Sequence, residues 1–250
     1  MTKRLLILGG THEAAALAEA VTARFGAAVE VISSLAGRTS APHRPVGAVR
    51  VGGFGGVAGL ETFLRAERID ALIDATHPFA ATISRHAADA SARAGVPRLV
   101  LARPPWLPEP GDRWACVADN EAAAGAAKDS GARRVFLTIG GRGLAPFATL
   151  TDLWFLVRLI ERPSEPIPLA HLRLILARGP FSVAAERDLM VEERIDLLIT
   201  RASGGAATEA KLIAARELLL PVILIDRPPG PGGEVVTTID EALVWLAVRL

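Results

Sequence analysis

Tyrosine is absent from the sequence, and cysteine occurs only once, as Cys116. A single cysteine excludes an internal disulfide bond and any cysteine-rich zinc or iron–sulfur site. The absence of tyrosine excludes the large class of reductases whose catalysis depends on a tyrosine paired with a lysine. We therefore expect a protein of a reducing compartment that holds no metal centre.

The sequence also lacks a charge bias and a long apolar run. It has 28 lysine and arginine residues against 27 aspartate and glutamate residues, so no global basic field points to nucleic acid. No uncharged apolar stretch approaches the roughly 18 residues that would span a bilayer, and the run at residues 5–8 is too short for a signal peptide. We expect a soluble cytoplasmic protein that binds neither nucleic acid nor membranes and holds any anionic ligand with locally clustered cations.

Short apolar runs alternate along the chain with segments of helical periodicity. Residues 5–8 form an apolar run without alternation, which is typical of a parallel strand covered on both faces, and Gly9 and Gly10 end it. A helix capped by Thr11 is predicted to follow, because Ala14, Leu17, Ala18 and Val21 recur at helical spacing. Further strands are predicted at 28–32, 48–51, 71–74, 98–101, 114–117, 133–138, 153–159, 172–176, 196–200 and 221–225, and helices at 60–66, 80–94, 121–130, 182–191, 206–218 and 240–250.

Repeated strand–helix units predict an α/β protein with two Rossmann-like domains, each built on a mostly parallel sheet flanked by helices. Residues 104–112 contain four prolines, which deny the chain both helix and ladder hydrogen bonds. We therefore predict an N-terminal domain at 1–103, a proline-rich linker at 104–112 and a C-terminal domain at 113–250.

Residues just after the first strands are candidates for binding a dinucleotide, because ligands of open parallel sheets lie beyond the carboxyl ends of the strands. Gly9, Gly10 and Thr11 open the first helix, where free backbone N–H groups attract phosphate, although glycines also serve plain turns. After the second strand, where NAD-preferring sites place an acid, the chain has Ser33, Ser34, Arg38 and Thr39, which suit a 2′-phosphate but are also compatible with an ordinary polar loop. Gly53 lies in a glycine-rich segment that either admits a cofactor or is simply flexible.

Thr76, His77 and Pro78 follow the predicted strand at 71–74. Proline favours an extended conformation at His77, which would project the imidazole toward a ligand. A histidine there can donate a proton near neutral pH, but such a histidine is more often a hydrogen-bonding spacer. His77 is thus the one candidate catalytic residue.

Cationic and glycine residues also follow the predicted strands of the second half, where they could bind a polyanionic substrate. Each cation alone is typical of a solvated surface, and only their common placement at strand ends favours a site. The candidates are Gly141, Arg142, Gly179, Pro180, Phe181, Ser182, Arg201, Ser203, Gly204 and Lys211, with Arg178 as a further nearby cation.

Four motifs in this order resemble the precorrin-6A reductase family of cobalamin biosynthesis: LILGGTHEA at 6–14, DATHPFAATISRHA at 74–87, GPFS at 179–182 and TRASGGAATEAKLIAAREL at 200–218. The resemblance implies two Rossmann-like domains with an NADPH cleft between them, and reduction of a ring-D double bond of the precorrin-6A macrocycle to give precorrin-6B. The chain departs from the family where it has His12, Ala15, Arg201 and Ala202 in place of the more usual threonine, arginine, lysine and asparagine or aspartate.

The resemblance leaves two alternatives open. The same motifs would serve a reductase of cobalt-precorrin-6A, and a non-catalytic NADP(H)-binding sensor would also bind the cofactor. As a pathway enzyme, the protein could hand its tetrapyrrole product to neighbouring enzymes.

Overall fold

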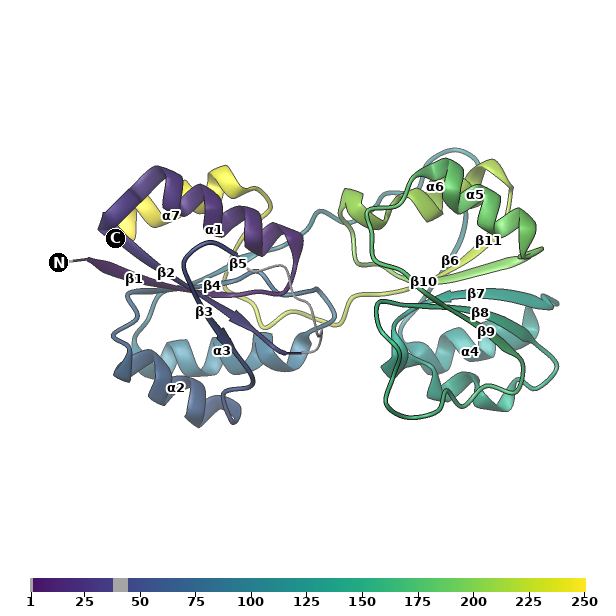
Figure 1. The fold of residues 1–250 in the computed structure, drawn as a ribbon, viewed down its shortest axis with the longest axis horizontal. Helices are drawn as coiled ribbons and strands as arrows, with labels where there is room; N and C mark the ends of the chain where they lie inside the picture. Colours follow the sequence, from purple (N-terminus) through teal and green to yellow (C-terminus); the bar gives the residue numbers. More distant parts are fainter. Residues whose placement is uncertain (1, 38–44) are drawn as a thin grey trace. The chain divides into compact units, whose positions relative to one another are not determined.

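Two six-stranded sheets, in which every strand pairs in parallel with its neighbours, organise the chain (Figure 1). The computed structural model describes residues 2–37 and 45–250, which divide into two compact units. The predicted α/β class with helix-flanked parallel sheets is confirmed. None of the helices within the described residues is both long and apolar enough to cross a membrane.

The sheet of the first unit has the strand order β12-β5-β4-β1-β2-β3. Its helices form two layers, with α1 and α7 on one face and α2 and α3 on the other (Figure 1). The elements are β1 (Lys3–Leu8), α1 (His12–Phe25), the 3-10 turn η1 (Gly26–Ala28), β2 (Val29–Leu35), β3 (Ala48–Val51), α2 (Gly56–Ala66), β4 (Ala71–Asp74), α3 (Ala81–Ala94), β5 (Arg98–Leu101), β12 (Glu234–Val236) and α7 (Ile239–Arg249).

The two helical layers explain the apolar run of β1. Leu5 and Ile7 pack into the cluster beneath α1 and α7, whereas Leu6 and Leu8 pack into the cluster beneath α2 and α3. Because successive side chains of a strand point to opposite faces, a strand covered on both sides needs apolar residues at every position.

The sheet of the second unit has the order β6-β11-β10-β7-β8-β9. Helices α5 and α6 cover one face, and α4 lies on the other (Figure 1). The elements are β6 (Arg113–Val117), α4 (Asn120–Asp129), β7 (Arg134–Thr138), η2 (Gly141–Gly143), η3 (Ala145–Thr149), β8 (Trp154–Leu159), β9 (Leu172–Leu176), α5 (Val183–Glu192), β10 (Leu197–Arg201), η4 (Ala206–Thr208), α6 (Ala210–Glu217) and β11 (Pro221–Ile225).

The C-terminal segment of the chain returns to the first unit, so the predicted domain at 113–250 is wrong. Residues 228–250 cluster with residues 1–103: β12 pairs with β5 through Val235 and Val100, and Trp245 and Leu246 of α7 are buried in the first unit's core. The sequence analysis missed this return because β12 has only three residues. Without β12, strand β11 and the helix that follows it resemble one more strand–helix unit of the second sheet.

The proline-rich segment at 104–112 is not a separate linker, because it belongs to the second unit. The indole Nε1 of Trp106 donates a hydrogen bond to the Gly205 carbonyl at 3.2 Å. The guanidinium of Arg216 in α6 binds both carboxylate oxygens of Asp112, at 2.9 and 3.0 Å. Side-chain contacts hold the segment where the prolines prevent backbone ladders.

Candidate cofactor and substrate sites

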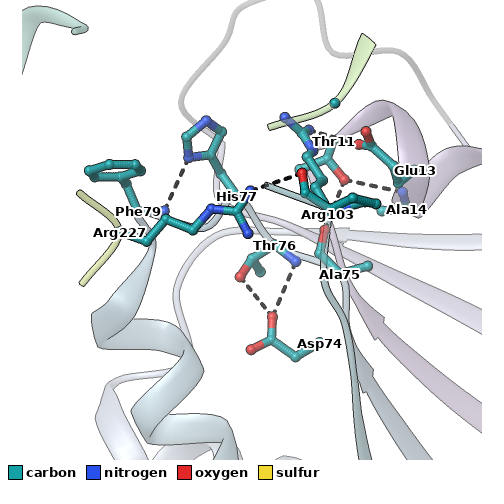
Figure 2. A network of polar contacts seen from close by, with 12 residues as sticks. Thr11, Glu13, Ala14, Asp74, Ala75, Thr76, His77, Phe79, Arg103 and Arg227 are labelled. Carbon is teal, nitrogen blue, oxygen red and sulfur yellow. Dashed lines mark hydrogen bonds and ion pairs between the residues drawn. The ribbon is translucent and has the colours of Figure 1, made fainter. Parts of the chain in front are cut away.

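The turn between β1 and α1 is fixed to the end of β4 by Thr11 (Figure 2). As the N-cap of α1, Thr11 accepts a hydrogen bond from the Ala14 N–H at 3.1 Å, as predicted. Its hydroxyl also donates to the Ala75 carbonyl at 2.8 Å. Gly10 has a φ of 99°, which a residue with a side chain rarely adopts. The structure thus brings Gly9, Gly10 and Thr11 beside the end of β4.

An ion pair lies next to this turn (Figure 2). Glu13, in the first turn of α1, accepts a hydrogen bond from Arg103, which follows β5, at 2.7 Å. An acid in the first helical turn is favoured by the helix dipole. Arg103 lies at the carboxyl edge of the sheet, with its charge paired to Glu13, and the sequence analysis did not identify it.

The residues that follow β4 form a second fixed turn (Figure 2). Asp74 Oδ1 accepts hydrogen bonds from the Thr76 N–H at 3.1 Å and the Thr76 hydroxyl at 2.7 Å. His77 Nδ1 accepts one from the Phe79 N–H at 3.2 Å, across Pro78. A neutral imidazole that accepts at Nδ1 carries its proton at Nε2. This bond orients the His77 ring.

At the ends of β2 and β3, an arginine that the sequence analysis did not single out organises the predicted polar residues. Ser33 and Ser34 are buried, and Ser34 Oγ accepts a hydrogen bond from Arg50 at 2.9 Å. Arg50 also binds the carbonyls of Gly52 and Gly53. The candidates Arg38 and Thr39 lie outside the described residues.

In the second unit, the loop after β7 packs against Arg201 at the end of β10. A Cβ atom on Gly143 would lie 3.2 Å from the Arg201 guanidinium and 2.9 Å from Asn120 Oδ1, so only glycine fits without a shift. Burial lowers the pKa of Arg201. Arg142 of the same loop is exposed. The structure therefore brings Gly141, Arg142 and Arg201 to one edge of the sheet.

Ser182 has a structural function, and neighbouring candidates are described by their conformation or packing. Ser182 caps α5 by accepting a hydrogen bond from the Ala185 N–H at 3.2 Å. Ser203 is buried, and Gly204 has a φ of 65°. The Gly179–Pro180 bond is cis, and the Phe181 ring lies 3.9 Å from the Arg158 guanidinium carbon, measured to the ring centroid.

Lys211 lies inside the second unit rather than on its surface, with 4% of its surface exposed. Its Nζ donates to the Thr208 carbonyl at 2.5 Å and lies 5.0 Å from the Trp106 ring centroid. Burial, and to a smaller degree repulsion from Arg158, lower the pKa of Lys211 to about 7. A group this buried makes a poor surface site for a substrate carboxylate.

Arg158 and Glu186 form a buried ion pair at 2.5 Å, which the sequence analysis missed. The other carboxylate oxygen of Glu186, Oε2, has no hydrogen-bond partner among the described residues. The arginine within the apolar run of β8 could have indicated this ion pair, because a charge on a strand covered on both faces needs a partner. Within the described residues, no group of three or more histidine, cysteine or acidic side chains is arranged to hold a metal ion.

Comparison with known proteins places the chain in a family. Residues 4–247 match the family described as precorrin-6x reductase CbiJ/CobK. The chain is 53% identical to the precorrin-6A reductase of Rhodococcus erythropolis, over 97% of both chains. It is 49% identical to the precorrin-6A reductase of Mycobacterium tuberculosis, over 98% of this chain and 97% of that one. The cobalt-precorrin-6A reductase of Synechocystis is 28% identical, over 94% and 92%.

A solved structure agrees with this similarity. It is described as CobK precorrin-6A reductase and superposes with a TM-score of 0.92 at 46% identity, covering 100% of this chain and 97% of that one. The chain therefore belongs to the precorrin-6A reductase (CbiJ/CobK) family.

Proposed function

We propose that this precorrin-6A reductase of cobalamin biosynthesis takes its reducing equivalents from NADPH and acts on the metal-free macrocycle, giving precorrin-6B. The observation that carries the proposal is the full-length similarity to precorrin-6A reductases, which exceeds the similarity to the cobalt-precorrin relative. The family's reductase activity requires a reducing cofactor, and the carboxyl edge of the first sheet has the features of a dinucleotide site.

The N-terminus of α1 is the proposed phosphate site. Thr11 holds the turn so that the first N–H groups of a 14-residue helix face the carboxyl edge of the sheet. Such N–H groups, together with the helix dipole, favour a phosphate. Gly10 leaves the approach free of a side chain, since nothing lies within 4 Å of where its Cβ atom would be.

The second unit is proposed to bind the macrocycle, which carries several carboxylates. Arg142 and Arg201 lie at the carboxyl edge of its sheet and can donate charge-assisted hydrogen bonds to carboxylates. When bound, NADPH supplies a hydride to one carbon of the ring double bond, and a proton completes the reduction. The protein contributes orientation and electrostatic stabilisation.

We propose that His77 positions ligands rather than donating the proton, because the Phe79 N–H fixes its ring through Nδ1. A general acid contributes about a hundredfold or more to the rate. His77→Asn should therefore reduce the single-turnover rate of hydride transfer by less than about tenfold. A drop beyond a hundredfold with both ligands still bound would make His77 the proton donor.

The function is tested by incubating the purified chain with NADPH and either precorrin-6A or cobalt-precorrin-6A, following NADPH oxidation and the product mass. We expect oxidation with precorrin-6A, and a product heavier by one equivalent of dihydrogen. Faster turnover of the cobalt compound would assign the chain to the other substrate. Binding of NADPH without oxidation in the presence of either macrocycle would favour the sensor function.

A further inference from the structure

Arg50 is a partly buried arginine at the carboxyl edge of the first sheet. It lies in β3 directly opposite Ser34 of β2 in the parallel register. One terminal nitrogen donates to Ser34 Oγ and to the Gly52 carbonyl, both at 2.9 Å, and the other donates to the Gly53 carbonyl at 3.1 Å. These bonds fix the guanidinium beside the glycine-rich loop that begins at Gly52.

Two aromatic rings cover the same group. The guanidinium carbon of Arg50 lies 3.7 Å from the ring centroid of Phe54 and 5.2 Å from that of Phe63. The two rings pack edge to face, with centroids 5.2 Å apart. One face of the guanidinium is thus held against an aromatic surface, and its hydrogen-bonding edge faces the ends of β2 and β3.

No acidic side chain neutralises this charge within residues 2–37 and 45–250. The sequence itself contains no aspartate or glutamate from Val31 to Leu60. Burial lowers the pKa of Arg50, with no counteracting acid. An anion bound at this position would pair with a charge that no acidic side chain of the described residues neutralises.

We propose that Arg50, together with Ser34, binds the 2′-phosphate of the cofactor and so makes NADPH the preferred reductant; this rests on the proposed function. In dinucleotide-binding folds the adenosine ribose lies at the end of the second strand, where an acid selects NAD and an arginine accommodates the 2′-phosphate. Arg50 has N–H groups beyond those its three bonds occupy. Ser34, which accepts from Arg50, keeps its own hydroxyl proton to donate to a phosphate oxygen.

The test compares the binding of adenosine 2′,5′-bisphosphate and 5′-AMP, which differ only in the 2′-phosphate, by calorimetric titration. In the full-length protein, Arg50→Gln should weaken binding of the bisphosphate by roughly tenfold to a hundredfold and change 5′-AMP binding little. The control is Arg93→Gln, at an exposed arginine in the last turn of α3 of the same unit, which should leave both affinities unchanged. NADPH and NADH are titrated in parallel. The affinity for NADPH should change as the affinity for the bisphosphate does, and the affinity for NADH should change as that for 5′-AMP does.

An equal loss of both nucleotides in Arg50→Gln would overturn the proposal, because it would mean that Arg50 only holds the glycine loop. An unchanged preference for the bisphosphate would overturn it as well. If the wild type itself binds NADPH no better than NADH, the proposed cofactor is wrong. If Arg50→Gln does not fold, Arg50→Lys serves as the second variant, because lysine keeps the positive charge and a long aliphatic side chain. We expect it to weaken binding of the ligands that carry a 2′-phosphate by less than Arg50→Gln does, and to leave binding of the other ligands unchanged.

Discussion

At the residue scale, Arg201 is the cation that we propose for the substrate site of the second unit. Its guanidinium lies against Gly140 and Gly143, and burial lowers its pKa. A carboxylate that pairs with such a charge forms a strong hydrogen bond.

We predict that Arg201→Ala weakens binding of the macrocycle by roughly tenfold to a hundredfold and leaves NADPH binding nearly unchanged, measured by titration of each ligand. Arg187→Ala is the control, because Arg187 is an exposed arginine of α5 in the same unit. Arg142→Ala should weaken binding less, because Arg142 is exposed and its contacts are screened. Normal macrocycle binding in both the Arg201 and Arg142 variants would remove the second-unit cations from the substrate site.

Sequence reasoning found some site residues and missed others for identifiable reasons. Thr11 was predicted as a helix cap because capping depends on a local pattern of residues. Arg50 was missed because its importance depends on Ser34, an opposing residue on a neighbouring strand. Lys211 was identified, but its burial against Trp106 depends on how the segment at 104–112 packs, and local sequence does not reveal that packing.

Helix α6 buries its lysine along with its apolar face, and this has a consequence for stability. The pKa of Lys211 is lowered from 10.5 to about 7 in the folded chain, mainly by burial. Between these two pH values the unfolded chain binds a proton that the folded chain lacks, so the contribution of Lys211 to stability rises with pH across this window. Below pH 7 both states bind the proton, and folding bears the full cost of burying the charge.

We predict that the free energy of unfolding of the wild type, relative to Lys211→Met, increases by on the order of 3 kcal/mol between pH 7 and pH 10. Denaturant unfolding at several pH values measures the difference. Lys128→Met, at an exposed lysine of α4, should show no such trend. A flat difference for Lys211→Met would mean that Lys211 titrates at its ordinary pKa in the folded state.

Among the strands, the central ones were predictable, and one edge strand, β12, was not. Strands such as β1 and β10 contain unbroken apolar runs, at residues 5–8 and 197–199, because helices cover both faces of the sheet there. Strand β12 pairs on one side only and has three residues, too few for a periodicity. The error in the domain boundary follows from that one missing strand.

The whole molecule consists of a unit made from one continuous segment and a unit made from two. The second unit comprises residues 104–227, and the first is closed by residues 228–250. Leu246 of α7 is fully buried in the core of the first unit. Completion of that core thus depends on contacts between residues more than two hundred positions apart in the sequence.

Leu246→Ala should destabilise the first unit by about 2 to 5 kcal/mol, as expected for a large-to-small change in a core. Hydrogen exchange should accelerate in β1 and β4 and stay unchanged in β7 and β10. Val248→Ala is the control on the same helix, because Val248 is 79% exposed, and it should cost less than about 0.5 kcal/mol. Equal acceleration in both sheets would argue against separate stability of the two units.

The return of residues 228–250 to the first unit also sets the order in which the cores can be completed during synthesis on the ribosome. Domains generally fold as their segments emerge, with the N-terminal one first. Here the second unit emerges complete while β5 still lacks its neighbour β12 and the apolar groups beneath α7 are still uncovered. The unit that is translated first is therefore the last to complete its native core. Until residues 228–250 have been synthesised, its sheet has an open edge at β5 that chaperones or neighbouring chains can reach.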